Sequence, residues 1–200
     1  MKIGFIGAGA VAQSIARSAI QAGHEVVLSA RRGPQVLREI VAELGPKATA
    51  GTVQEVARLE LVMLAVPWPQ VPSALEGLPD WAGRILVDTT NPFTQYEPEL
   101  VLADLGDTGA SEIVAAHAPG ARVVKAFNAI RMEYYDKGPK YHGGKRVIFV
   151  SSDDKDAKVV VTGLVEEFGY APVDLGGLVS GGRMQQAGGP IAGRDWVLGS

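Results

Sequence analysis

A short glycine-rich segment near the N-terminus has the residue types and spacing that bind a pyrophosphate. Gly7, Gly9 and Ala12 form the pattern Gly-x-Gly-x-x-Ala, after an apolar run at residues 2–6 and before a helical pattern at 11–21. The first glycine permits a tight turn, the second lets the backbone approach the phosphates, and the third small residue lets the helix pack closely. The N–H groups at the start of that helix attract the anion.

This motif predicts a dinucleotide site, and the end of the second predicted strand indicates which dinucleotide. The expected contacts from the turn are Gly7, Ala8, Gly9, Ala10, Val11 and Ala12. NAD sites usually place Asp or Glu about 20 residues after the glycines, but here the strand at 25–28 is followed by Ser29, Ala30, Arg31 and Arg32. A hydroxyl with two guanidinium groups suits a 2′-phosphate, so the sequence favours NADP(H) over NAD(H). Two alternatives stay open: a glycine-rich turn in another α/β protein, and solvated arginines that start the next helix.

Small and amide-bearing residues follow three further predicted strands. Ligands of a doubly wound sheet sit outside the carboxyl ends of its strands, so these positions are candidate walls of the site. The expected cofactor contacts are Ala65, Val66, Pro67, Asn91, Pro92, Ala126 and Asn128, and those of a second substrate are Phe127, Ala129 and Ile130. Asn-Pro is also a good turn initiator, and Trp68 also fits a core position.

Apolar runs alternate with helical patterns along the chain, which predicts a sheet covered by helices on both faces. We expect strands at 2–6, 25–28, 48–50, 61–66, 85–88, 122–127, 146–150 and 171–175, and helices at 11–21, 34–44, 53–58, 70–78, 111–118 and 154–168. Ser111 is the expected N-cap of its helix. The glycine-rich sequence after residue 175 is expected to be irregular or weakly helical. The predicted fold is α/β, a Rossmann-type doubly wound, mainly parallel sheet with a small C-terminal βαβ extension.

The composition is that of a globular protein with one core. The chain has 200 residues, 46% hydrophobic and 20% charged, with a formal net charge of −3 and no cysteine. We expect a single domain over 1–200, with a dinucleotide-binding core at 1–130 and an extension at 131–200 that contributes to the second-substrate pocket and to a dimer contact. The charge gives no reason to expect a nucleic-acid or membrane partner, and the histidine spacing gives none to expect a metal. Without a recognisable secretory or membrane segment, a cytoplasmic location is expected.

Several segments resemble the NADP oxidoreductases that depend on the deazaflavin coenzyme F420. That family shares its N-terminal fold with the ferric-reductase domains of the STEAP metalloreductases. The segments that carry the resemblance span nearly the whole chain and are 7–12, 29–32, 65–68, 88–92, 124–128 and 173–178. The resemblance implies that NADP lies across the N-terminal turn and that the deazaflavin stacks on the nicotinamide near C-terminal elements, with Leu178 among its contacts. The chain departs from the family at 179–189, where glycines replace a helix, so the electron partner stays open between F420, a flavin and another acceptor.

Hydride transfer between two stacked rings requires proximity and orientation more than a protein acid or base. None of the three histidines, His24, His117 and His142, follows a predicted strand. Tyr134 and Tyr135 come soon after one, but packing is the favoured role for both. The sequence therefore predicts no obligatory catalytic side chain.

Three classes of function remain open. The favoured one is hydride transfer between NADPH and F420, FMN or FAD stacked on the nicotinamide. The others are a reductase of a small carbonyl or imine, which usually adds a long helical domain, and a non-enzymatic NADP(H) sensor. The expected partners are a small-molecule redox acceptor and, in a homodimer, a second copy of the chain.

Overall fold

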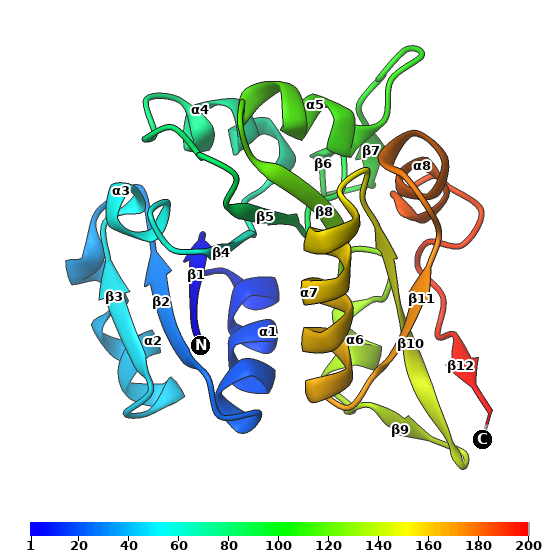
Figure 1. Ribbon diagram of the computed structural model, residues 1–200, viewed down its shortest axis with the longest axis horizontal. Coiled ribbons are helices and arrows are strands. Elements are labelled where there is room, and N and C mark those ends of the chain that lie inside the picture. Colours follow the sequence, from blue (N-terminus) through cyan, green and yellow to red (C-terminus); the bar gives the residue numbers. More distant parts are fainter. Residues whose placement is uncertain (200) are drawn as a thin grey trace.

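A twisted, mainly parallel sheet forms the centre of the molecule in the computed structural model, which describes residues 1–199 (Figure 1). The strands of the sheet are β1 (Lys2–Ile6), β2 (Glu25–Ser29), β3 (Ala48–Gly51), β4 (Leu61–Leu64), β5 (Ile85–Asp88), β8 (Arg122–Ala126), β10 (Gly144–Ser151) and β11 (Ala171–Asp174). Their order is β3-β2-β1-β4-β5-β8-β10-β11. From β3 to β8 all neighbours are parallel, whereas β10 is antiparallel to β8 and parallel to β11. This is the Rossmann strand order, extended by a βαβ unit at one edge, and the predicted fold class is confirmed.

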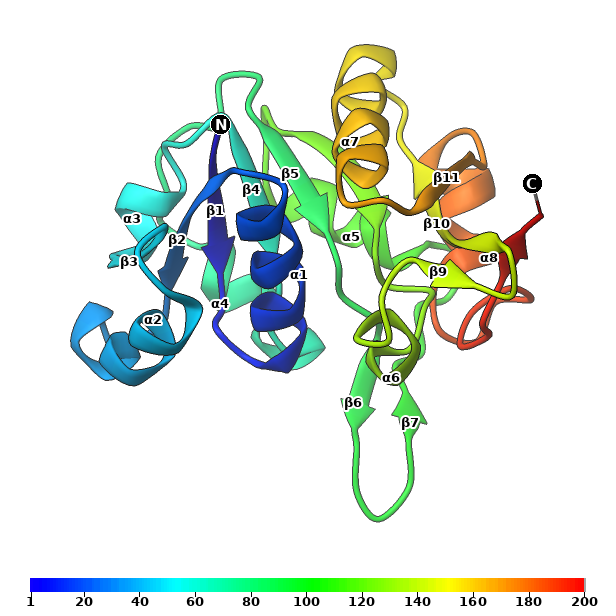
Figure 2. The same ribbon diagram turned by 90° about the horizontal axis from the view of Figure 1, so that it is seen from below.

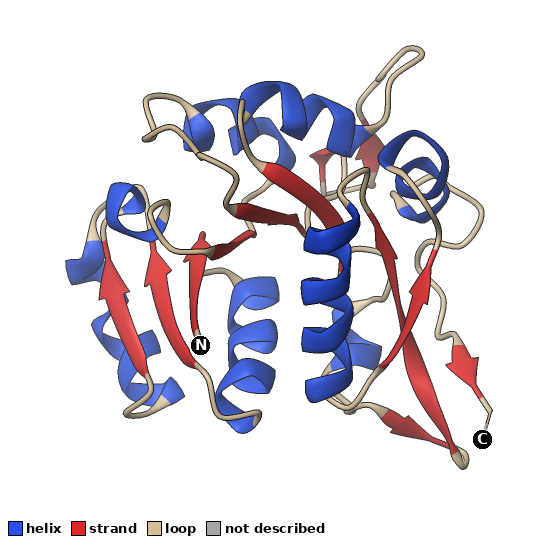
Figure 3. Cartoon of the chain, viewed as in Figure 1, coloured by secondary structure: helices blue, strands red, loops and turns tan. Residues whose placement is uncertain are grey.

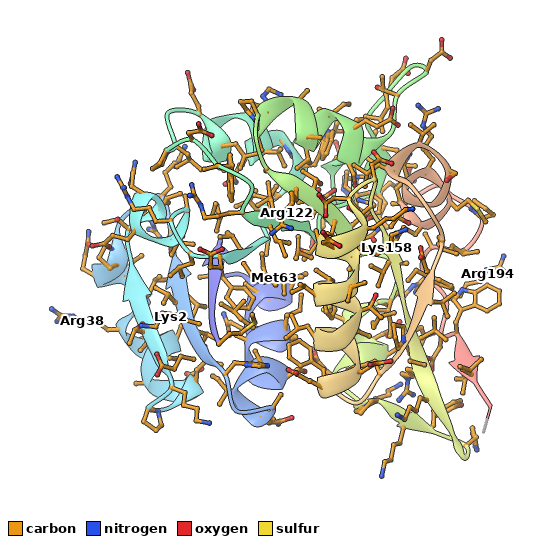
Figure 4. All side chains as sticks on the ribbon, in the orientation of Figure 1. Lys2, Arg38, Met63, Arg122, Lys158 and Arg194 are labelled. Atoms are coloured by element: carbon orange, nitrogen blue, oxygen red, sulfur yellow. The ribbon has the colours of Figure 1, made fainter. Side chains whose placement is uncertain are left out.

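Helices cover both faces of the sheet, as Figure 3 shows. The helices on one face are α1 (Ala10–Gln21), α2 (Arg38–Leu44), α6 (Met132–Tyr135) and α7 (Lys155–Glu167), and those on the other are α3 (Val53–Val56), α4 (Val71–Leu75) and α5 (Ala110–His117). Because both faces are covered, the central strands are apolar throughout, and all four residues of β4 are buried. In Figure 4, Met63 of β4 lies inside the molecule, whereas Arg38 and Arg194 reach outward at opposite ends.

Several short elements were not predicted. A hairpin of β6 (Phe93–Gln95) and β7 (Val101–Leu102) projects from the body (Figure 2). Two short strands, β9 (Lys140–Tyr141) and β12 (Val197–Leu198), pair with β10. Each of these four strands is too short to be detected from a pattern of apolar residues.

Three predicted boundaries need correction. The predicted helix at 34–44 begins with a 3₁₀ turn, η1 (Pro34–Leu37), and the one at 70–78 follows η2 (Trp68–Gln70) and ends at Leu75. Ser111 is not an N-cap, because α5 begins one residue earlier and Gly109 caps it. The Glu112 carboxylate accepts a hydrogen bond from the Gly109 N–H at 2.7 Å, which satisfies a free donor at the helix start.

The glycine-rich C-terminal sequence is irregular with short helical turns, as its composition predicts. It contains η3 (Leu178–Gly182), a π-helical turn, followed by the short helix α8 (Arg183–Gln185). Beyond α8 the chain crosses the ends of β5 and β8 without regular structure until β12, and we call residues 186–193 the C-terminal strap. Within residues 1–199, no helix combines the length and the apolar character needed to span a bilayer.

Candidate functional site

Three cavities follow one another along the carboxyl edge of the parallel strands. The first has a volume of about 500 Å³, the second about 290 Å³ and the third about 570 Å³. The first and second share wall residues Gly9, Ala65, Val66 and Pro67, and the second and third share Val11, Thr89, Asn91, Phe93 and Tyr96. Shared walls make the three cavities one continuous groove, at the edge where doubly wound sheets bind ligands.

The turn between β1 and α1 lies where the first two cavities meet. Gly7 has φ +108°, and a Cβ there would collide with the carbonyl oxygen of Ala65, so this position requires glycine. Gly9 caps α1 without a side-chain acceptor, and a Cβ built there meets nothing within 4 Å. The first-turn amides of α1 therefore open onto free space, which a phosphate can occupy. Ala12 is buried and packs α1 against the sheet.

The end of β2 contributes one arginine to the first cavity. Arg31 and Arg32 are both exposed, but only Arg31 lines that cavity, together with Ala30 and Gly33. Neither guanidinium has a carboxylate partner within residues 1–199. Ser29 requires a correction: its side chain is fully buried and its hydroxyl donates to the Phe5 carbonyl at 2.8 Å, so it does not face the cavity.

The far wall of the first cavity begins at the N-terminus of α3. Thr52 and Glu55 form a capping box there, in which the Glu55 carboxylate accepts from the Thr52 N–H at 2.8 Å. The hydrogen bonds from the Thr52 backbone and hydroxyl hold the pKa of Glu55 below its usual range. The box fixes the positions of Thr52, Val53 and Gln54 along the cavity wall.

At the second cavity, the segment after β5 is held by a buried ion pair. Lys125 lies 2.9 Å from Asp88, and both side chains have no exposed surface. Burial alone would raise the pKa of Asp88, but the Lys125 charge and the hydrogen bonds from Ser111 and Thr90 outweigh it, so the pKa lies below its ordinary value. Asp88 is therefore ionised at neutral pH.

Asn91 and Asn128 connect the ends of β5 and β8. The Asn91 side chain donates to the Asn128 carbonyl at 2.8 Å, and its oxygen accepts from the Asn128 side chain at 3.1 Å. That Asn91 oxygen also accepts from the N–H of Ala187 in the C-terminal strap, at 2.9 Å. Asn128 Oδ1 is buried and has no hydrogen-bond partner within residues 1–199.

The backbone at the end of β8 is strained. Phe127 has φ +65°, a left-handed conformation that costs a non-glycine residue about 1–2 kcal/mol. Its buried ring packs against Tyr135 and Phe168, with centroid distances of 6.2 and 6.1 Å. Packing of the ring holds this turn, which directs Asn128, Ala129 and Ile130 along the third cavity.

The third cavity is mainly apolar, and three further segments complete its wall besides Val11, Thr89 and Asn91. The hairpin contributes Phe93 and Tyr96, whose rings lie 5.4 Å apart. The segment after β8 contributes Asn128, Ala129 and Ile130. The C-terminal strap adds Ala187, Gly188, Ala192 and Gly193. The strap is fixed there because Gly193 donates to the Ala129 carbonyl at 2.7 Å.

Some predicted site residues lie away from the groove. Pro92 and Ala126 are buried, and Leu178 packs in the core with residues of α5 and β8, so it does not face the groove. His24 and Tyr135 were not predicted as site residues, and His24 contacts Glu167 and the N-terminal amine. Tyr135 is buried and donates to Ser18 Oγ at 2.9 Å.

The sequence interpretation missed several groove residues, and only some of them had a recognisable signal. The start of α3 at Val53 was predicted correctly. The Thr52-x-x-Glu55 capping box could also have indicated that Thr52 ends the preceding loop at this wall. The hairpin residues Phe93 and Tyr96 and the strap had no comparable pattern, because their positions depend on long-range contacts.

Comparison with known proteins gives consistent matches. Residues 2–92 match the model of the family described as NADP oxidoreductase, coenzyme F420-dependent. The chain is 30% identical to metalloreductase STEAP3 of Rattus norvegicus over 90% of its own length. It spans about a third of the length of that protein and of the other curated relatives it matches.

Solved structures extend the match to the C-terminal elements. A hypothetical protein of Sinorhizobium meliloti, SMa0349, is 32% identical with a TM-score of 0.92, over 99% of this chain and 96% of that one. A candidate F420-dependent NADP-reductase from Arthrobacter sp. FB24 is 28% identical with a TM-score of 0.78, over 89% of this chain and 86% of that one. These matches confirm the resemblance found in the sequence. Over residues 2–92 the chain is thus similar to the coenzyme F420-dependent NADP oxidoreductases, and over most of its length it is similar to a candidate NADP-reductase of that kind.

Proposed function

We propose that the groove binds NADPH across its first two cavities and a planar redox acceptor, a deazaflavin or a flavin, in the third. The observation that carries this proposal is the continuity of the three cavities, which share walls from Gly9 to Asn91. A dinucleotide on the first two cavities has its reactive end beside the third, so both rings can meet.

The residues along the groove fit this assignment. Arg31 supplies a guanidinium without a carboxylate partner for the 2′-phosphate, and Gly9 leaves room for the pyrophosphate at the start of α1. The proposed contacts of Arg31 with the 2′-phosphate and of Gly9 with the pyrophosphate follow the order of these groups in the cofactor.

The chemistry is supplied by the bound molecules, since NADPH carries the hydride and the acceptor carries the ring that receives it. The protein's residues orient the two rings and exclude water. Apolar walls at Phe93, Ile130 and Met132 suit this task.

The test is NADPH oxidation with F420, FMN and FAD as separate acceptors, beside a small aldehyde and a cyclic imine. Oxidation with a deazaflavin or flavin and none with the carbonyl and imine is the expected result. Tight NADPH binding without oxidation by any acceptor would contradict the proposal and favour a sensor.

A further inference from the structure

The ion pair of Asp88 and Lys125 does not touch the groove, yet it lies directly behind it. Neither residue has exposed surface, and neither forms the wall of any of the three cavities. Removing two charges from water costs several kcal/mol per ion, and a buried pair often adds little net stability compared with apolar residues. The role of the pair therefore lies in the geometry that it imposes on its neighbours.

The hydrogen bonds of the pair converge on Thr90. Asp88 Oδ1 accepts from the Thr90 N–H at 2.9 Å and from the Thr90 hydroxyl at 2.7 Å. Lys125 Nζ donates to the Thr90 carbonyl at 3.1 Å. All three polar groups of Thr90 are thus held by one ion pair, which fixes both its backbone and its side chain.

The second oxygen of the carboxylate is held from a different element. Asp88 Oδ2 accepts from Lys125 at 2.9 Å and from the Ser111 hydroxyl of α5 at 2.6 Å. Ser111 is buried and is not part of the groove wall. The carboxylate therefore has one hydroxyl partner on the groove side, Thr90, and one on the helix side, Ser111.

Thr90 lies between the two residues that the second and third cavities share at this point. Thr89 and Asn91 line both cavities, and the Thr89 hydroxyl donates to the Leu64 carbonyl at 2.8 Å. Asn91 in turn holds Asn128 and the C-terminal strap. The conformation at Thr90 thus determines where the groove wall runs at the expected nicotinamide end.

We infer that Asp88 and Lys125 are positioning residues for the nicotinamide half of the cofactor, acting through Thr90. This inference rests on the proposed function, because it assigns the nicotinamide to the wall at 89–91. The pair contributes nothing to the adenosine half, whose cavity lies on the other side of Gly9 and Pro67. Loosening Thr90 therefore weakens binding of NADPH but not of 2′,5′-ADP, which carries the 2′-phosphate and adenosine without the nicotinamide.

The test compares calorimetric affinities for NADPH and 2′,5′-ADP in two matched variants. Thr90→Val and Ser111→Ala each delete one hydroxyl bond to the same carboxylate, but only Thr90 belongs to the groove wall. Thr90→Val is expected to lower the affinity for NADPH about tenfold and to change the affinity for 2′,5′-ADP less than about twofold. Ser111→Ala is expected to change both affinities less than about twofold. Thr90→Ser, which keeps the hydroxyl, is expected to retain the wild-type NADPH affinity.

Lys125→Met provides a stronger version of the same test. It removes the bond to the Thr90 carbonyl and leaves Asp88 without a counter-charge, so a larger loss of NADPH affinity than in Thr90→Val is expected. A thermal melt first establishes whether this variant folds, and if it does not, Thr90→Val carries the test alone.

Each outcome separates this inference from the proposed function. If the unaltered protein binds neither nucleotide, the proposed function fails. If it binds both, equal loss of the two affinities in Thr90→Val, no loss of either, or equal NADPH losses in Thr90→Val and Ser111→Ala would overturn the inference.

Discussion

At the residue scale, Arg31 and Arg32 are adjacent in the chain but differ in their relation to the first cavity. Only Arg31 lines the cavity wall. We therefore expect Arg31→Ala to weaken NADPH binding by about 10- to 100-fold, because a hydrogen bond to a charged group contributes roughly 1.5–3 kcal/mol. Arg32→Ala is the matched control and should lose less than about threefold, with affinities measured by titration calorimetry.

NADH serves as the second ligand in that experiment. It lacks the 2′-phosphate, so its affinity should be unchanged in both variants and well below that of NADPH in the unaltered protein. Equal affinities for NADPH and NADH before any substitution would remove the assignment of Arg31 to a 2′-phosphate.

Gly7 and Gly9 give a second matched pair, with opposite expected effects. Gly7→Ala is expected to destabilise the fold by about 1–3 kcal/mol, because φ is +108° and the new Cβ meets the Ala65 carbonyl. Gly9→Ala has extended backbone and free space around it, so its stability should change by less than about 1 kcal/mol. The new Cβ of Gly9→Ala would instead occupy the pyrophosphate position and lower the affinity for NADPH at least about tenfold.

Urea denaturation and NADPH titration of both variants measure these effects. Unchanged NADPH affinity in Gly9→Ala would show that the phosphates do not lie over this turn.

The pH dependence of stability gives a third prediction at this scale. The folded-state pKa of Asp88 lies below its ordinary value of 3.8, because Lys125 and two hydroxyl groups outweigh the cost of burial. The unfolded chain thus binds this proton at higher pH than the folded one, so the stabilisation is present above about pH 4 and is lost as the pH falls through the folded pKa.

A double variant, Asp88→Asn with Lys125→Met, removes the titrating group while keeping similar side-chain shapes. Its free energy of unfolding should fall less steeply than that of the unaltered protein between about pH 5 and pH 3. Urea denaturation at a series of pH values measures both slopes, and identical slopes would contradict an ionised, paired Asp88.

Most groove residues that the sequence predicted share one property, a place directly after a parallel strand. Gly9, Arg31, Pro67, Asn91 and Asn128 were all found by that rule. This rule does not predict the orientation of a side chain. For that reason Ser29 was expected to face a phosphate, whereas its hydroxyl donates to the Phe5 carbonyl. Whether each groove residue binds the cofactor stays a prediction.

At the element scale, the C-terminal strap forms one wall of the third cavity and none of the first two. Ala192→Trp should therefore fill the third cavity, raise the KM for the acceptor at least about tenfold and leave the Kd for NADPH unchanged. Steady-state kinetics with varied acceptor, beside NADPH titration, makes the comparison. A loss of NADPH affinity as large as the loss for the acceptor would mean that the strap belongs to the cofactor site.

Long, strongly patterned elements could be predicted, and short ones held by distant contacts could not. The run at 61–64 is apolar on both faces because helices cover both, so its identity as a central strand is readable in the sequence. The strap is held by Asn91 and Ala129, which are remote from it in sequence. Its glycines predicted irregular structure correctly, but no local pattern indicates where an irregular segment lies.

At the scale of the whole molecule, the sheet brings the ends of six parallel strands, β3, β2, β1, β4, β5 and β8, to one edge, and the groove runs along all of them. Strands β10 and β11 contribute no residue to the three cavities. The order of strands thus determines the order of the cavities, with Arg31 near one end of the groove and the hairpin near the other. The homodimer expected from the sequence stays a prediction, which light scattering tests.

Label transfer tests the central claim most directly, since the claim is that a hydride passes between two rings in contact. The protein is mixed with F420 and NADPH deuterated at C4, in separate samples for the two faces of the ring. For one of the two samples, deuterium is expected in the reduced deazaflavin without dilution by solvent protons. NADPH oxidation in which the label is lost to water, or no oxidation despite binding of both molecules, would contradict the account.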